Sequence, residues 1–302
     1  MKRPFFRPLA FLSAAAIAFV FVSCGDGSGT DGDTATTTKD STDKTNDSVE
    51  VKQYAQVPSP GEMFTFMKMV GTQNAKPDVL NPTDNQKKYE SKKAQGLNFG
   101  IYSADLLYCS TFGLGPQALK YFATVKQMGD KLQVATSISE KDQERIKNNI
   151  GNSDSLAAIS NDLYYSSFAN LEKNERGADL SLMLAGGWTE SLFLMTGLVK
   201  DFDKDNQAVI RIAEQKYSLD NLIEYMTVHE SNDDVSAVLK QMTELKALFD
   251  QIQDPAANNG GMNSKSGKRV LGGKPKLTVT KELFEQIRTK ITEIRNSHIG
   301  LQ

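Results

Sequence analysis

The segment from Asn174 to Val199 constrains the fold more than any other part of this 302-residue chain. Its middle, LSLMLAGGWTESLFLMTGLV, is apolar almost all the way round a helix and not only along one stripe. A helix of this kind is stable only when other elements cover it on every side. We therefore expect this segment to form the central buried helix of the protein.

The rest of the chain after Pro58 supplies the helices that would cover it. Apolar residues recur at three- and four-residue spacing, and strand signals are almost absent. Helical patterns extend over 62–70, 85–112, 116–134, 139–150, 154–172, 174–199, 205–215, 218–230, 233–252 and 280–297, and not every one of them need be a separate helix. The sequence predicts an all-α protein of about eight or nine helices, arranged as a multi-helix bundle or as stacked helical hairpins.

Composition divides the chain into three parts. Residues 1–23 begin with three basic residues and continue into a short apolar run, an order that is typical of a secretion signal. Residues 24–53 are rich in Gly, Ser, Thr and Asp and hold too few apolar side chains to fold, so we expect a disordered, acidic tether. The helical domain is expected over 54–302, with a mobile Gly- and Lys-rich loop over 254–277.

The distribution of charge argues against one class of function. Residues 25–50 carry seven acids and two lysines, which leaves the helical body close to neutral. Proteins that bind nucleic acids use a strongly positive surface, which a neutral body lacks. No nucleic-acid partner is therefore expected.

Histidine and cysteine are scarce in this chain. His229 and His298 are the only histidines, and both are expected on the surface. Cys109 lies in an apolar helix and is expected to be a small, buried hydrophobic residue. Because His and Cys ligands would need partners that are not present, the sequence predicts neither a metal site nor a cofactor.

Two similar segments are the strongest candidates for a binding site. Each places one acid in an apolar helix, Asp105 in ADLLY and Glu190 in TESLF, and each has an aromatic residue just upstream, Tyr102 and Trp188. Glycines precede both acids. Two adjacent glycines within a helix indicate either close helix contact or a ligand that approaches the backbone.

Several roles are open to this pair of acids. Asp105 and Glu190 could face each other across the core, where they would bind a cation or a basic ligand, or titrate with raised pKa values. In the simpler alternative, polar neighbours satisfy each acid, which then only fixes the register of its helix. Catalysis by two acids would need their carboxyl groups about 5–10 Å apart.

Cys24 directly follows the apolar run and the small residue Ser23, and this arrangement resembles the lipobox of bacterial lipoproteins. The resemblance implies that Cys24 is lipidated and becomes the mature N-terminus. Phe21 stands where that family usually has Leu. An ordinary signal peptide or N-terminal anchor is the alternative.

Together with Cys24, the stretches GIYSADLLYCSTF, ERGADLSLMLAGGWTESLF and IRTKITEIRN resemble a family of uncharacterised all-helical lipoproteins of Bacteroidota-type bacteria. The resemblance covers most of residues 58–302 and brings no known activity. It implies a protein anchored by lipid in the cell envelope, in the outer membrane, at the periplasmic face or on the cell surface. In such bacteria, short Asp-Ser or Asp-Thr motifs resemble O-glycosylation sites, which makes Thr34, Ser41 and Ser48 candidates.

The sequence therefore favours a non-enzymatic envelope protein whose helical body binds a partner protein or a small ligand. The expected partners are the membrane, through the lipid anchor, and an envelope protein. One alternative is an enzyme, or a cation- or ligand-binding site, that uses Asp105 and Glu190. Another is a sensor domain in which a ligand shifts the packing of the helices.

Overall fold

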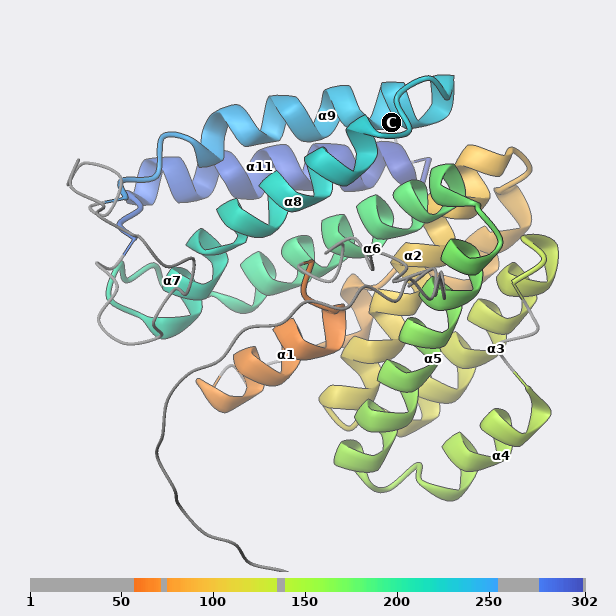
Figure 1. The fold of residues 1–302 in the computed structure, drawn as a ribbon. Helices are drawn as coiled ribbons and strands as arrows, with labels where there is room; N and C mark the ends of the chain where they lie inside the picture. Colours follow the sequence, from red (N-terminus) through yellow and green to blue (C-terminus); the bar gives the residue numbers. More distant parts are fainter. Residues whose placement is uncertain (1–56, 72–74, 135–138, 255–276, 301–302) are drawn as a thin grey trace, which may run out of the picture. The chain divides into compact units, whose positions relative to one another are not determined.

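The computed structural model describes residues 57–71, 75–134, 139–254 and 277–300. The chain divides into two units, Met1–Glu50 and Val51–Gln302, and all described residues belong to the second. These residues form ten α-helices and two short 3-10 helices, with no strand among them beyond an isolated bridge between Gln253 and Thr278 (Figure 1). The all-α prediction is confirmed, with ten helices where about eight or nine were expected.

Some predictions lie outside the described residues. They concern Cys24, the tether with Thr34, Ser41 and Ser48, and almost all of the expected loop over 254–277. Within the described ranges, no helix is both long and apolar enough to cross a membrane.

The helices begin and end close to the predicted positions. Their bounds are α1 Pro60–Met69, η1 Pro77–Val79, η2 Thr83–Lys88, α2 Lys92–Thr111, α3 Gly115–Lys131, α4 Glu140–Asn148, α5 Ser153–Lys173, α6 Gly177–Leu198, α7 Gln207–Ala213, α8 Gln215–Thr227, α9 Asp233–Phe249 and α11 Lys281–His298. Local caps fix several ends: Ser59 and Glu62 form a capping box on α1, and Thr280 caps α11. The largest difference is at α2, which begins at Lys92 because Ser91 caps it there, whereas the helix was expected from residue 85.

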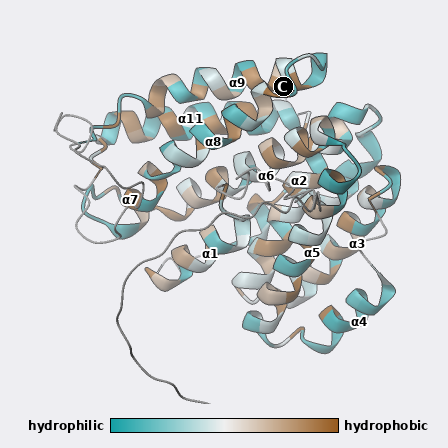
Figure 2. Cartoon of the chain, viewed as in Figure 1, coloured by the Kyte–Doolittle hydropathy of each residue, from teal (hydrophilic) through white to brown (hydrophobic). Residues whose placement is uncertain are grey.

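Helices α2 and α6 form the centre of the described body. α3 and α5 pack against α2, whereas α8, α9 and α11 pack against α6 (Figure 1). α1 contacts both central helices, and α4 contacts α3 and α5. Figure 2 shows α4 as largely hydrophilic, and it buries a single residue, Ile146. The prediction for α6 is confirmed, since every residue over 180–192 is buried.

Glycines allow α2 and α6 to approach closely. A Cβ added to Gly100 would collide with the carbonyl oxygen of Met183, and one added to Gly186 would collide with that of Leu97. Gly187 also lies against Gly100. The paired positions rise together along both chains, so the two helices run parallel. Of the two interpretations of these glycines, close helix contact is the one observed.

The predictions for Cys109 and His298 had different outcomes. Cys109 is buried as predicted, and burial raises the pKa of its thiol. The surface prediction for His298 was wrong: the ring is buried, and its Nε2 lies 2.9 Å from Gln241 Oε1. His298 follows Ile291 by seven residues and therefore lies on the apolar stripe of α11. Burial lowers the pKa of His298 to about 4.

Candidate functional site

The close crossing of α2 and α6 brings Asp105 and Glu190 together. Asp105 follows Gly100 by five residues and Glu190 follows Gly186 by four, so in a parallel pair both acids lie about one turn beyond the crossing. Both side chains are fully buried. The two carboxyl groups lie close enough to share a hydrogen bond. The structure therefore brings the two acids together in the core.

Arg295 of α11 supplies the positive charge of this cluster. Its Nε donates to Glu190 Oε2 at 3.0 Å, and its Nη2 donates to Glu190 Oε1 at 3.2 Å. This two-point contact is the geometry in which a guanidinium holds a carboxylate most firmly. Burial disfavours the charge on Arg295, but Glu190 outweighs that effect and raises the pKa of the guanidinium. Burial also raises the pKa of Glu190, although Arg295 opposes that shift. Because the guanidinium contacts both oxygens of Glu190, we assign the negative charge of the cluster to this carboxyl group.

Asp105 is the protonated acid of the cluster. Burial and the negative charge of Glu190 raise the pKa of Asp105 well above its ordinary value, although Arg295 opposes this shift. The backbone N–H of Asn81 donates to Asp105 Oδ2 at 3.3 Å, whereas no donor reaches the buried Oδ1. Two carboxyl groups can share a hydrogen bond only when one of them carries a proton. With a proton on Asp105, a carboxylate on Glu190 and the guanidinium of Arg295, the cluster has no net charge.

Polar side chains around Asn81 hold the segment between α1 and α2 over the acids. Asn81 Nδ2 donates to the hydroxyl of Tyr89 at 3.1 Å and to Asn98 Oδ1 at 3.3 Å. The carbonyl oxygen of Asn81 accepts from the hydroxyl of Tyr121 at 3.0 Å. Because Asn81, Tyr89 and Asn98 are all buried, these bonds satisfy groups that water cannot reach. The acids are thus part of a network that fixes a connecting segment.

The two predicted aromatic neighbours have different surroundings. Tyr102 lies among the rings of Tyr89 and Tyr121, and its hydroxyl donates to the carbonyl of Pro82 at 2.9 Å. Burial raises the pKa of Tyr102, and the neighbouring Tyr89 and Asp105 add to the shift. Trp188 packs instead against Phe249 of α9, with ring centroids 6.3 Å apart. The structure brings Tyr102 to the acid pair, whereas Trp188 belongs to the packing of α6 against α9.

The arrangement limits the chemistry open to Asp105 and Glu190. Neither side chain has any exposed surface, and the cation beside Glu190 is Arg295 of the same chain. Among the described residues, no group of three or more His, Cys, Asp or Glu side chains could hold a metal ion. A substrate would have to separate packed helices to reach either acid. The geometry therefore favours the simpler role, in which polar neighbours satisfy the acids and fix helix register.

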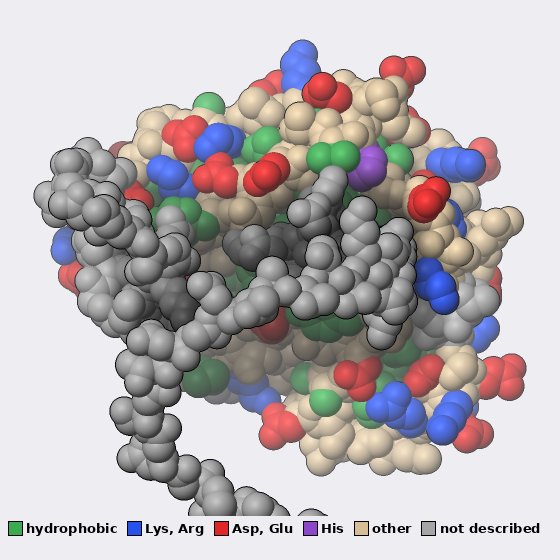
Figure 3. Space-filling view, in the orientation of Figure 1, with side chains coloured by type: hydrophobic (Ala, Val, Ile, Leu, Met, Phe, Trp, Pro, Cys, Tyr) green, Lys and Arg blue, Asp and Glu red, His purple; other side chains and the backbone are tan. Residues whose placement is uncertain are grey.

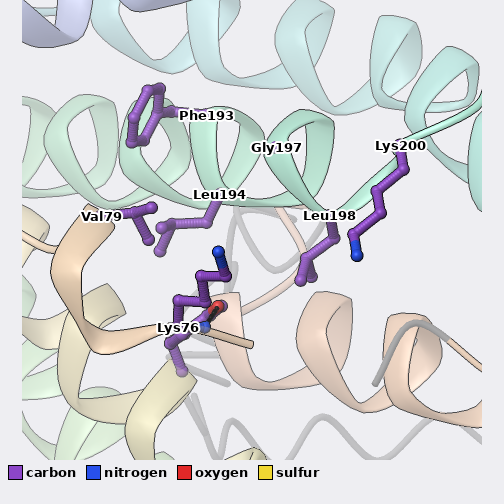
Figure 4. Close-up of a pocket in the computed structure, with 8 residues that line it drawn as sticks. Lys76, Val79, Phe193, Leu194, Gly197, Leu198 and Lys200 are labelled. Carbon is purple, nitrogen blue, oxygen red and sulfur yellow. Dashed lines mark hydrogen bonds between the residues drawn. The ribbon is translucent and has the colours of Figure 1, made fainter. Parts of the chain in front are cut away.

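A pocket opens on the surface close to this cluster. It lies between the last turns of α6 and the segment around η1, and its volume is about 230 Å³ (Figure 4). Apolar side chains form most of its surface, and two lysines lie at its edge. The lining residues are Lys76, Val79, Tyr108, Phe193, Leu194, Gly197, Leu198 and Lys200. No pattern in the sequence predicts this pocket, because its residues come from three separate segments.

Arg295 connects the pocket to the buried acids. Its Nη2 donates to the carbonyl of Val79 at 3.2 Å, and its guanidinium carbon lies 4.6 Å from the centre of the Phe193 ring. Val79 and Phe193 both line the pocket. One side chain therefore contacts the lining of the pocket and the carboxylate of Glu190 at the same time.

Comparison of the chain with protein-family models, with curated protein sequences and with solved structures finds no match. We therefore infer the function from the residues of this chain alone.

Sequence reasoning missed Arg295, although a signal for it was present. Ile291, Ile294, Arg295 and His298 follow one another at helical spacing, so all four lie on the buried stripe of α11. A basic residue on an apolar stripe predicts a buried acidic partner, because an unpaired charge is strongly disfavoured there. Asn81 gave no comparable signal, since it lies in an irregular segment between two prolines and short turns.

Proposed function

We propose that this protein is a lipid-anchored protein of the cell envelope that binds a small ligand and catalyses no reaction. The observation that carries the proposal is the pairing of Glu190 with Arg295 beside a protonated Asp105. The acids that a catalytic mechanism would need already have internal partners and no access to solvent. We assign recognition to the surface pocket between α6 and η1, because Arg295 joins its lining to the buried cluster.

The pocket has the composition of a ligand site. Small-molecule sites are concave and mostly apolar, with a few polar groups that orient the ligand. Val79, Leu194 and Leu198 supply apolar surface here, and Lys76 and Lys200 supply charge. Figure 3 offers a contrast, since on the face it draws the acidic and basic side chains are interspersed over α8, α9 and α4.

The anchor and the location are proposed from the N-terminal sequence. A basic start, a short apolar run and Cys24 support lipidation, and the acidic, Ser- and Thr-rich residues after it support a tether. Labelling cells with a palmitate analogue should mark the wild-type protein but not a Cys24→Ala variant. Equal labelling of both proteins would contradict the anchor. A native tether whose mass shows no added sugar would contradict glycosylation at Thr34, Ser41 and Ser48.

Ligand binding is tested on protein isolated from its own envelope. Native mass spectrometry should detect a small molecule bound to the wild-type protein and absent from a Gly197→Leu variant. A Cβ on Gly197 meets no atom within 4 Å, so a larger side chain can enter the pocket without a clash. The matched control is Gly151→Leu, because a Cβ on that glycine also meets no atom within 4 Å and Gly151 does not line this pocket.

The partner-protein alternative gives a different result in crosslinking. Crosslinking in cells would then capture the same envelope protein with the wild type and with Gly197→Leu, and neither protein would carry a small molecule. In that case the helical body binds a protein, and the small-ligand proposal is wrong.

A further inference from the structure

We infer that the pocket between α6 and η1 binds a small amphipathic anion, whose acid group lies between Lys76 and Lys200 and whose apolar body lies on Leu194 and Leu198. This inference rests on the proposed binding function and names the chemical class of the ligand. Three properties of the pocket carry it: unpaired positive charge, a directed hydroxyl donor and a small apolar volume.

The first property is the charge at the edge of the pocket. Lys76 and Lys200 both line it, and no acidic side chain does. Neither ammonium group forms an ion pair or a hydrogen bond with any described residue, since the bond of Lys76 to Tyr108 comes from its backbone N–H. Figure 4 shows the Lys76 side chain directed toward Leu194 and the Lys200 side chain directed alongside Leu198. Two cations without a counterion next to apolar surface favour a ligand that brings a negative charge.

The second property is the hydroxyl of Tyr108. It accepts a hydrogen bond from the backbone N–H of Lys76 at 3.0 Å, and within the described ranges its own proton has no acceptor. Burial raises the pKa of Tyr108 to about 12, so the hydroxyl keeps its proton at neutral pH. Such a hydroxyl can donate to a ligand oxygen. It adds a directed donor to the two diffuse charges of the lysines.

The third property is the size of the apolar region. The pocket has a volume of about 230 Å³. It is smaller than most sites for drug-sized molecules, which span roughly 300–1,000 Å³. A ligand of about eight to ten non-hydrogen atoms fits, whereas a lipid with two acyl chains does not. A short-chain carboxylate is the simplest molecule with this size and charge.

The neighbouring core gives the ligand firm support. Val79 is held by Arg295 through its carbonyl group, and the Phe193 ring stacks on the same guanidinium. Because Arg295 is itself fixed by Glu190, one side of the pocket is formed before a ligand arrives. A preformed pocket reduces the entropy that is lost on binding.

The experiment compares hexanoate, 1-hexanol and hexylamine, which share an apolar chain and differ in charge. Isothermal titration calorimetry and NMR titration of the purified protein measure the dissociation constants. Hexanoate should bind with a Kd of about 10 µM to 1 mM, given its number of atoms. Hexanol should bind at least about tenfold more weakly, and hexylamine should show no binding, because the lysines repel it.

Three variants test the assignment of residues. Lys76→Met and Lys200→Met should each weaken hexanoate binding about twofold to fivefold and reduce its salt dependence, because each lysine forms one exposed ion pair with the ligand. Gly197→Leu should abolish binding while circular dichroism matches the wild type and the unfolding temperature is not lowered. Lys147→Met is the matched control: it removes the same charge from α4, which does not line the pocket, and should leave binding unchanged.

Two outcomes separate this inference from the proposed function. If hexanol binds as tightly as hexanoate, or if a bound native ligand proves to be neutral or cationic, the ligand class is wrong but the binding function stands. If none of the probes binds and no small molecule accompanies the native protein, both are wrong.

Discussion

Replacing Asp105 by Asn tests the central claim about the buried cluster, namely that Asp105 is protonated. Asn has nearly the same shape as a protonated Asp. Its carbonyl oxygen can accept from the backbone N–H of Asn81, and its amide can donate toward Glu190, as the acid proton does. The variant therefore keeps the hydrogen bonds of the cluster and removes only the need to take up a proton.

The magnitude follows from the difference between the folded and unfolded states. An unfolded Asp has a pKa of 3.8 and is ionised at pH 7. Keeping the folded side chain protonated at pH 7 therefore costs at most about 4 kcal/mol, at about 1.4 kcal/mol per pH unit. The sign is that of a raised acid pKa: the folded state binds more protons than the unfolded state, so the wild type loses stability as pH rises above about 4. Asn at position 105 should recover about 2–4 kcal/mol at pH 7 and almost nothing at pH 4.

Urea denaturation at pH 4, 5, 6 and 7 measures this difference directly. The gain of Asp105→Asn over the wild type should increase with each pH unit. Asp142→Asn is the control with the opposite sign. Burial acts against ionisation of Asp142, but hydrogen bonds from Ser139 outweigh it and lower its pKa. Asp142 therefore stabilises the folded protein above its unfolded pKa. Asp142→Asn should be less stable than the wild type at pH 7, and this difference should disappear below about pH 3.

One result would refute the reasoning. If Asp105→Asn is less stable than the wild type at pH 7 by about 1 kcal/mol or more, Asp105 is ionised in the folded protein. Arg295 would then balance two carboxylates, and the assignment of the shared proton would be wrong.

Three further predictions concern the core. Gly186→Ala should lower the free energy of unfolding by about 2–4 kcal/mol, because its Cβ collides with the backbone of α2. Gly197→Ala on the same helix should raise that free energy by about 0.5–1 kcal/mol. If urea denaturation gives similar values for both variants, α2 and α6 do not cross at glycine. Arg295→Met should lower the free energy of unfolding by about 3–5 kcal/mol at pH 7. The decrease should be smaller at pH 5, because Glu190 can take up a proton there. A decrease that is the same at both pH values would contradict the ion pair. Between pH 6.5 and 4 the free energy of unfolding of the wild type should fall by about 3 kcal/mol, because His298 gains a proton in the unfolded state but not in the folded state. His298→Gln should remove this decrease. If both proteins lose stability equally on acidification, the ring is exposed.

The helices could be predicted from the sequence because their signals are local. Caps such as Ser59 and Thr280 act within a few residues, and the apolar stripes repeat every turn. The prediction failed mainly at the start of α2, where Ser91 begins the helix and the preceding residues form 3-10 turns. The all-round apolar character of α6 correctly predicted that it lies at the centre.

The candidate site could be predicted only in part. An acid within an apolar helix must be buried with a partner, so Asp105 and Glu190 were identifiable from their neighbours alone. Their partner Arg295 lies 105 positions after Glu190, and Asn81 lies 24 positions before Asp105. No local pattern in the sequence pairs residues so far apart.

The sequence by itself determined the helical class of the protein, the burial of α6, the glycines that permit close packing and the presence of two acids in apolar surroundings. Each of these depends on residues within a few turns of one another. Only the tertiary structure decided that α2 and α6 run parallel, that Arg295 neutralises Glu190, and that Lys76 and Lys200 meet at one pocket. The physical reason is that packing direction and charge pairing depend on contacts between distant segments, whose energies enter only when the chain has folded.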